Sequence, residues 1–126
     1  MSYIPVKYKK PFILGYFDGD GWFTNTKRSS DFGFCGNFEL INSISKYLTE
    51  IFNWEKPLTI TQETHSKITF RIDTQNKYKI KDFLNFYLSY ENKCDLLERK
   101  LNIAKILQEK IQIKEKKIIP PKSKKE

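Results

Sequence analysis

The stretch Ile13-Leu14-Gly15-Tyr16-Phe17-Asp18-Gly19-Asp20-Gly21 joins helix-compatible apolar residues to two acids and three glycines. Pro11 suits the first turn of a helix, where its missing N–H would have no partner. Gly21 suits the position just after a helix, because glycine readily adopts the left-handed conformation that closes one. The pattern therefore predicts a helix over residues 11–20, with both acids in its last turn.

Local energetics alone do not explain this helix end. A carboxylate in the last turn faces partial negative charge and costs about 0.3–1 kcal/mol, and a glycine inside a helix costs about 0.5–1 kcal/mol relative to alanine. Gly15 and Gly19 would share one helix face, where they would allow another backbone to approach closely. Carboxylates at the end of such a contact could hold a divalent cation.

Two other interpretations of residues 18–21 compete with this one. They could form a turn with solvated acids, and the residues alone leave that alternative open. They could also begin a calcium-binding loop, which needs oxygen ligands at its fifth, ninth and twelfth positions. Those positions hold Trp22, Thr26 and Ser29, so the calcium loop is excluded.

The nine residues resemble the signature of the LAGLIDADG homing endonucleases. Gly19 takes a position that is usually small, and Leu14 replaces the usual alanine. Four residues match the signature directly: Gly15, Asp18, Asp20 and Gly21.

The composition predicts one intracellular domain with a polyanionic partner. The chain has 126 residues and a net charge of +8, and 20 of its 23 basic residues are lysine. Such an excess favours nucleic acid as the partner, although a solvated lysine-rich surface would give the same count. Cys35 and Cys94 form neither a metal-site spacing nor a disulfide framework. We see no signal peptide and no apolar run near the ~20 residues of a membrane span, so we expect a cytoplasmic or nucleoid location, or an organellar one in a eukaryote.

The hydrophobic periodicity predicts the remaining elements in order. Residues 1–10 are expected to form a basic arm, residues 11–117 a single domain, and residues 118–126 a disordered basic tail. Asn37 is a plausible helix cap, and Pro120 and Pro121 are expected to end the last helix. The predicted strands are 22–27, 32–36, 58–62 and 67–74, and the helices after the first are 38–52, 77–88 and 93–117.

This order predicts an α+β fold with an αββαββα core. A four-stranded antiparallel sheet would be covered on one face by helices, as the LAGLIDADG resemblance also implies. Only one copy of the signature is present, and members of the family with one copy act as homodimers. The resemblance implies no membrane partner and no small-molecule cofactor.

The resemblance also implies where the chemistry lies. Gly15, Gly19 and Asp18 would lie at the dimer interface, and Asp20 would be the catalytic metal ligand at the bottom of a shared cleft. The Gly19 carbonyl is a second candidate ligand. Mg²⁺ would be the cofactor, with Mn²⁺ as a substitute, because both suit carboxylate and phosphate oxygens.

The family usually adds a basic residue near the start of the last core helix, where it supports the charge of the transition state. Lys100 and Arg99 are both candidates for this catalytic role, and the helix register does not choose between them. The alternative interpretation is that both are ordinary solvated residues on the surface of the helix.

The outward face of the sheet is the candidate DNA-binding surface, because a two-stranded ribbon fits the major groove. We expect this face to carry very few acids. The alternative interpretation is an ordinary solvent-exposed face that binds no DNA. Lys7, Lys9, Lys10 and the tail lysines would add phosphate contacts. Alternation assigns eight residues to the face: Thr24, Thr26, Arg28, Thr59, Thr61, Lys67, Thr69 and Arg71.

The sequence therefore favours a homodimeric, metal-dependent, site-specific double-stranded DNA endonuclease of the homing type, associated with intron or intein mobility. A DNA-binding regulator on the same scaffold that does not cleave is the first alternative. An RNA-binding splicing maturase is the second.

Overall fold

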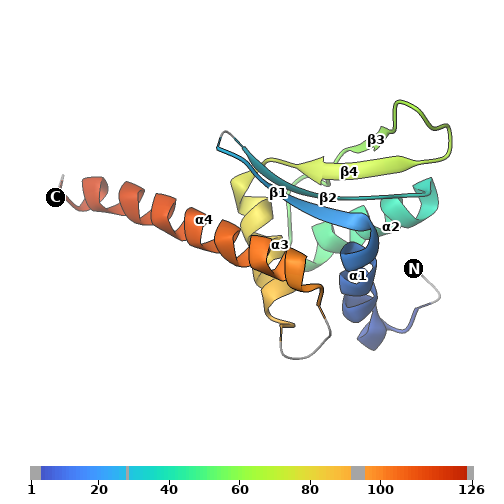
Figure 1. Cartoon of the computed structure of the whole chain (residues 1–126), viewed down its shortest axis with the longest axis horizontal. Helices are drawn as coiled ribbons and strands as arrows, with labels where there is room; N and C mark the ends of the chain where they lie inside the picture. Colours follow the sequence, from blue (N-terminus) through green and yellow to red (C-terminus); the bar gives the residue numbers. More distant parts are fainter. Residues whose placement is uncertain (1–3, 28, 92–95, 125–126) are drawn as a thin grey trace.

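The computed structural model describes residues 4–27, 29–91 and 96–124, and it confirms the predicted α+β architecture (Figure 1). Its four strands form one sheet in the order β1-β2-β4-β3, and each neighbouring pair is antiparallel. The elements are α1 (Val6–Asp20), β1 (Gly21–Asn25), β2 (Ser30–Gly36), α2 (Phe38–Ile51), β3 (Ile60–Gln62), β4 (Phe70–Thr74), α3 (Lys77–Leu88) and α4 (Glu98–Lys124).

The helices gather on one face of the sheet and leave the other face uncovered (Figure 1). Phe23, Phe32, Phe34 and Ile72 point from the strands toward the helices and are buried. The residues between them in each strand point to the uncovered face, because side chains alternate along a strand. We call this uncovered surface the open face.

An aromatic core fixes the rotation of α1. Phe17 is fully buried, and its ring centroid lies 4.7 Å from that of Phe23, 4.9 Å from that of Phe83 and 5.5 Å from that of Tyr87. Close edge-to-face contacts of this kind are worth about 0.5–1.5 kcal/mol each beyond area burial. With Phe17 held inward, the side of α1 that carries the two helical glycines faces outward.

The first helix begins at Val6, so the prediction of a start at Pro11 was wrong. Residues 6–10 are helical, and the N–H of Tyr8 bonds to the carbonyl of Pro5 at 2.9 Å. Pro11 lies inside the helix, where it removes one hydrogen bond of the ladder and crowds the carbonyl of Lys7, four residues earlier.

Gly21 ends the helix for a different reason from the one expected. Its φ of −101° and ψ of 178° are extended, so the chain passes directly from α1 into β1. A Cβ at this position would lie 2.3 Å from a ring carbon of Phe17. The glycine is therefore required by close packing against Phe17 and not by a left-handed turn.

Three of the strands are shorter than predicted. Ile68 falls within the predicted strand 67–74, but it is 79% exposed and precedes β4. The Ser66 hydroxyl accepts the N–H groups of Ile68 and Thr69, which holds these residues in a turn. The alternating pattern thus continues beyond the strand that it predicted.

The predicted cap of α2 is confirmed, whereas the predicted end of α4 is not. Asn37 caps α2 as expected, since its side chain accepts the N–H of Leu40 at 2.9 Å. The last helix continues through Pro120 and Pro121 to Lys124, so the expected end near residue 117 and the disordered tail were wrong over residues 118–124. The two prolines lack N–H donors and crowd the carbonyls of the preceding turn, yet the helix continues through them. The expected start at residue 93 lies outside the described residues.

None of the helices within the described ranges is long and apolar enough to cross a membrane.

Candidate active site and nucleic-acid interface

Asp18 joins three helices through its buried carboxylate. Its Oδ1 accepts the Tyr87 hydroxyl at 2.7 Å, and its Oδ2 accepts the N–H of Leu97 at 2.9 Å. Only 8% of the residue is exposed. Burial, reinforced by the hydrogen bond to Asp18, raises the pKa of the Tyr87 hydroxyl far above its usual value. Asp18 therefore acts within its own chain, and its carboxylate does not face the exposed side of α1.

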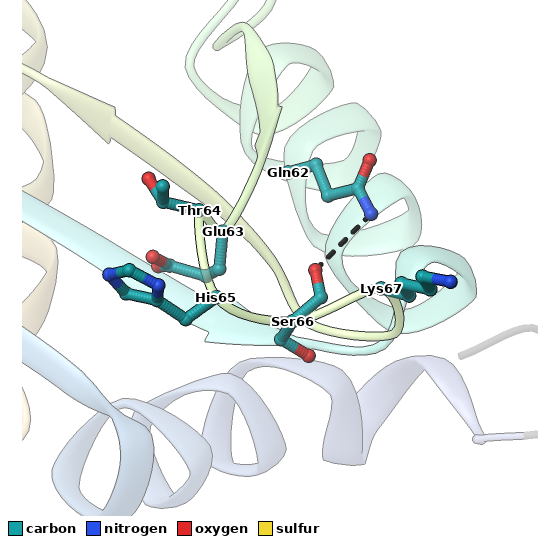
Figure 2. Close-up of a pocket in the computed structure, with 6 residues that line it drawn as sticks. All are labelled: Gln62, Glu63, Thr64, His65, Ser66 and Lys67. Atoms are coloured by element: carbon teal, nitrogen blue, oxygen red, sulfur yellow. Dashed lines mark hydrogen bonds between the residues drawn. The ribbon is translucent and has the colours of Figure 1, made fainter.

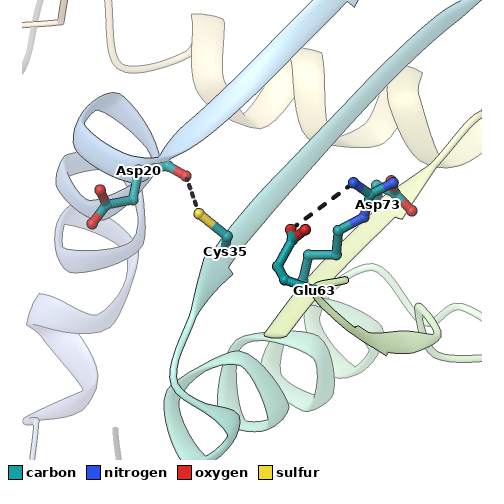
Figure 3. Close-up of polar contacts among 5 residues, drawn as sticks. Asp20, Cys35, Glu63 and Asp73 are labelled. Atoms are coloured by element: carbon teal, nitrogen blue, oxygen red, sulfur yellow. Dashed lines mark hydrogen bonds and ion pairs between the residues drawn. The ribbon is translucent and has the colours of Figure 1, made fainter. Parts of the chain in front are cut away.

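Asp20 is exposed at the end of the same helix (Figure 3). Within the described part of the chain, no residue forms a hydrogen bond or ion pair with its carboxylate. Its backbone carbonyl accepts a long contact from the Cys35 thiol at 3.5 Å, which ties the end of α1 to β2. The carboxylate is thus free to bind a ligand or a second chain.

Lys100 is the basic residue that the structure brings to the end of α1. It is 6% exposed, its ammonium donates to the carbonyls of Phe17 and Asp18, and it lies 5.2 Å from the centroid of the Phe17 ring. These contacts place positive charge against the negative end of the helix. Burial lowers the pKa of the Lys100 ammonium, and Asp18 opposes that change. The other candidate, Arg99, is exposed on the neighbouring position of α4.

The exposed side of α1 is open at both glycines. A Cβ added at Gly15 or at Gly19 would meet no atom within 4 Å. Neither glycine is needed for packing within one chain, so their intrinsic cost in a helix has no benefit inside the domain. The exposed side has room for another backbone.

A single chain offers an incomplete cation site. The described residues contain no group of three or more His, Cys, Asp or Glu residues that could hold a metal ion. Asp20 supplies one carboxylate, and Gly19 lies beside it with its backbone carbonyl. Hard oxygen donors fit Mg²⁺ and Mn²⁺ chemically. One carboxylate and one carbonyl would have to be completed by oxygen donors from outside the chain, such as a second carboxylate, a phosphate or water.

The register of the sheet sets the neighbours on the open face. Trp22, Gly33 and Asp73 form one row across β1, β2 and β4. A Cβ on Gly33 would lie 2.4 Å from the Trp22 ring, so this glycine leaves room for the indole to lie over β2. Cys35, Arg71 and Thr61 form the adjacent row across β2, β4 and β3.

The open face carries more acids than predicted. Arg71 donates to Asp73 at 2.8 Å and forms an ion pair with Glu63 at 3.9 Å (Figure 3). Asp31 lies on the same face, paired with Thr24. The expectation of very few acids was wrong, because Asp31 and Glu63 are brought here by strand pairing and by the β3–β4 hairpin.

The structure brings only part of the predicted DNA-binding set onto the strands. Thr24, Thr61 and Arg71 lie on the open face. Thr26 lies in the first hairpin turn, where its hydroxyl donates to the Ser29 carbonyl, and Thr59 precedes β3. Arg28 lies outside the described residues.

Lys67 and Thr69 belong to the β3–β4 connection. This connection surrounds an open hollow of about 560 Å³ (Figure 2). Lys67 is exposed at its rim, whereas the Thr69 hydroxyl contacts Ser66 at 3.0 Å. The lining residues are Gln62, Glu63, Thr64, His65, Ser66 and Lys67.

No protein-family model and no curated protein matches the sequence. Solved structures do match. The I-SmaMI LAGLIDADG homing endonuclease bound to cleaved DNA has a TM-score of 0.66 and 14% identity, over 86% of this chain and 37% of that one. The chain has the fold of a LAGLIDADG homing endonuclease.

Two further homing endonucleases share this LAGLIDADG fold. The archaeal intron-encoded I-Vdi141I, complexed with DNA, has a TM-score of 0.65 and 17% identity, over 82% of this chain and 69% of that one. The group I intron-encoded I-CeuI, also complexed with DNA, has a TM-score of 0.65 and 12% identity, over 90% of this chain and 57% of that one. The chain thus spans between about a third and about two thirds of these proteins.

In this LAGLIDADG fold, the signature stretch forms the second half of α1 and the first residue of β1. Sequence reasoning missed several residues around it. Tyr16 donates its hydroxyl to the Cys35 carbonyl and closes the seam between α1 and β2. Burial, with a contribution from Asp20, raises the pKa of both the Tyr16 hydroxyl and the Cys35 thiol. Trp22 could have been found, because alternation places it on the same face as Thr24.

Proposed function

We propose that this chain is one subunit of a homodimeric, metal-dependent endonuclease that cuts double-stranded DNA at a specific site. The observation that carries the proposal is the exposed Asp20 carboxylate, unpaired among the described residues, at the end of a helix whose glycine face is uncovered. The LAGLIDADG fold supports the assignment, because its solved examples include homing endonucleases bound to DNA.

The proposed dimer contact is the exposed side of α1. Gly15 and Gly19 lie one helical turn apart and leave room for a second copy of the same helix. A two-fold pairing of the two α1 helices would bring the two Asp20 residues together at one end of the contact. One chain supplies half of the donor set, and its partner supplies the other half.

Each residue at the helix end has a defined part in the proposed chemistry. Asp20 of each subunit, helped by the Gly19 carbonyl, would hold Mg²⁺ or Mn²⁺, which supplies activation of water and stabilisation of the departing 3′ oxygen. Lys100 holds the carbonyls of Phe17 and Asp18 near the end of α1 and would add positive charge near the scissile phosphate. Asp18 orients the helix end through Tyr87 and Leu97.

The open face would lie against the DNA. Arg71, Thr24 and Thr61 point from it and could contact base edges in the major groove. The net charge of +8 supplies attraction to phosphate that does not depend on sequence. The proposal fits the expected cytoplasmic, nucleoid or organellar location, where double-stranded DNA is present.

The test compares wild type with Asp20→Asn, and with Glu55→Gln as a matched control at an exposed acid between α2 and β3. Each purified protein is incubated with Mg²⁺ and a plasmid library of random sites, and the cut ends are sequenced. Wild type and Glu55→Gln should cut at one recurring site. Asp20→Asn should lose cleavage below detection while duplex binding stays or tightens, since repulsion between the carboxylate and phosphate is relieved.

Cleavage that survives in pure Asp20→Asn protein would overturn the catalytic assignment. A wild type that selects a duplex sequence but cuts nothing with Mg²⁺ or Mn²⁺ would indicate a regulator. Tighter binding to a structured RNA than to any duplex would indicate a maturase.

A further inference from the structure

We propose that Asp73 and Glu63 are specificity-determining residues, which hold Arg71 for recognition of a guanine and weaken its attraction to phosphates. The inference rests on the proposed binding of duplex DNA. It assigns the acids of the open face, which oppose DNA binding in general, a role in choosing among DNA sequences.

The geometry holds the guanidinium of Arg71 from two sides. Asp73 lies two residues further along β4 on the same face, and its Oδ2 accepts from Nη2 of Arg71 at 2.8 Å. Glu63, at the start of the β3–β4 connection, places its Oε1 3.9 Å from Nη1. The Arg71 side chain is still 42% exposed, so the group is held without being covered.

Trp22 provides a third side. Its ring extends over Gly33, the residue that pairs with Asp73, and the Arg71 guanidinium lies 6.0 Å from the ring. An aromatic side chain beside a guanidinium is attractive and restricts its rotation. Arg71 is therefore oriented by three partners that come from β1, β4 and the β3–β4 connection.

This arrangement suits a base better than a phosphate. A guanidinium carries five N–H donors in a rigid fork, and guanine offers two acceptors, O6 and N7, at its major-groove edge. Guanine is neutral, so the neighbouring carboxylates do not repel it. A phosphate is negatively charged, and Arg71 together with Asp73 and Glu63 carries a formal charge of −1, so the group repels it.

The acids should therefore matter most for discrimination. Without Asp73, the guanidinium loses its main acceptor and is free to turn toward phosphates at any sequence. Binding to non-matching DNA should then rise, while the preference for guanine at one base pair falls. An ordinary surface ion pair would change neither property, because exposed pairs contribute little.

The experiment selects bound duplexes from a random library with EDTA present, so that cleavage does not interfere. Full-length wild type, Asp73→Asn, Glu63→Gln, Arg71→Lys and the control Glu55→Gln are compared. Wild type and Glu55→Gln should prefer guanine at one base pair by about 5- to 100-fold. Asp73→Asn should lose most of this preference and bind non-matching DNA more tightly, with a salt dependence steeper by about one charge.

The remaining variants test the same idea from other sides. Glu63→Gln should show a smaller shift of the same kind, because its oxygen lies further from the guanidinium. Arg71→Lys keeps the charge but lacks the fork, so it should bind all sequences with a flattened preference. If Asp73→Asn unfolds, Glu63→Gln still decides the point, since Glu63 lies outside the strands.

Two failures can be told apart. A wild type that selects no duplex sequence removes the proposed function and this inference with it. Suppose instead that the wild type prefers one site, and that Asp73→Asn and Glu63→Gln keep the same preference as the control Glu55→Gln. That result removes this inference alone.

Discussion

The carboxylates of Asp18 and Asp20 end the same helix in opposite environments. Asp18 is 8% exposed and accepts two hydrogen bonds, from Tyr87 and Leu97, whereas Asp20 is exposed and unpaired among the described residues. The separation follows from helix geometry, because residues two apart point about 200° away from each other. Asp18 is used in packing the domain, whereas Asp20 remains available for the proposed chemistry.

Asp18→Asn should therefore destabilise the fold, whereas Asp20→Asn should not. An asparagine keeps the shape but loses the charge, and its NH₂ cannot accept a bond from Tyr87 or Leu97. We expect a loss of about 1–3 kcal/mol in the free energy of unfolding, measured by urea denaturation. Asp20→Asn should change that energy by less than about 0.5 kcal/mol or raise it slightly. Equal losses in both variants would contradict this division of roles.

Tyr87 should make the protein less stable in alkali. The pKa of its hydroxyl is raised in the folded state, so the unfolded chain releases this proton first as the pH rises. Stability from this group is complete below pH ~10, where the unfolded tyrosine titrates, and falls above it. In Tyr87→Phe the thermal midpoint should fall less between about pH 9 and 11. Tyr78→Phe, at a 69% exposed tyrosine, serves as the control and should follow wild type.

Lys100→Met should lower the free energy of unfolding, whereas Arg99→Met should leave it nearly unchanged. The substitution leaves the carbonyls of Phe17 and Asp18 without their buried donor, at an expected cost of about 1–3 kcal/mol in unfolding free energy. Arg99 is exposed, and its replacement should stay within about 0.5 kcal/mol. Chemical denaturation measures both. A cost at Arg99 as large as that at Lys100 would show that α4 is rotated from the position described.

Gly19→Leu should block association without harming the single domain. No atom lies within 4 Å of an added Cβ, so the side chain fits, and the loss of a helical glycine should add about 0.5–1 kcal/mol of stability. Wild type should be a dimer at micromolar concentration by light scattering, and Gly19→Leu a folded monomer. Lys46→Leu, at an exposed position of α2, controls for added apolar surface. A wild type that stays monomeric on DNA would contradict the dimer.

The sequence predicted the element order because each signal was local. Asn37 lies at the cap that its side chain forms, and Phe32 and Phe34 of β2 alternate with smaller residues, as a half-buried strand requires. The start of α1 was missed because a proline favours the first turn of a helix, whereas here Pro11 lies inside one. Gly21 was misinterpreted because its requirement comes from the ring of Phe17, a tertiary contact that no local rule contains.

The candidate site was harder to predict because it depends on pairing and rotation. Lys100 and Arg99 differ by about 100° around α4, and only packing decides which of them reaches α1. Alternation gives the face of Asp73 but not its neighbour across the sheet. Glu63 and Trp22 join Arg71 only once the strand register is known.

The anchors of α1 come from far along the chain. Asp18 and Leu97 are separated by 79 positions, and Phe17 and Lys100 by 83. Contacts of such long range form late, and a chain emerges from the ribosome from its N-terminus at about 5–20 residues per second. For several seconds the nascent polypeptide therefore carries the whole acidic signature without the groups that fix its geometry. The proposed DNA cutting would therefore begin only after synthesis has passed the residues of α4 that fix this geometry.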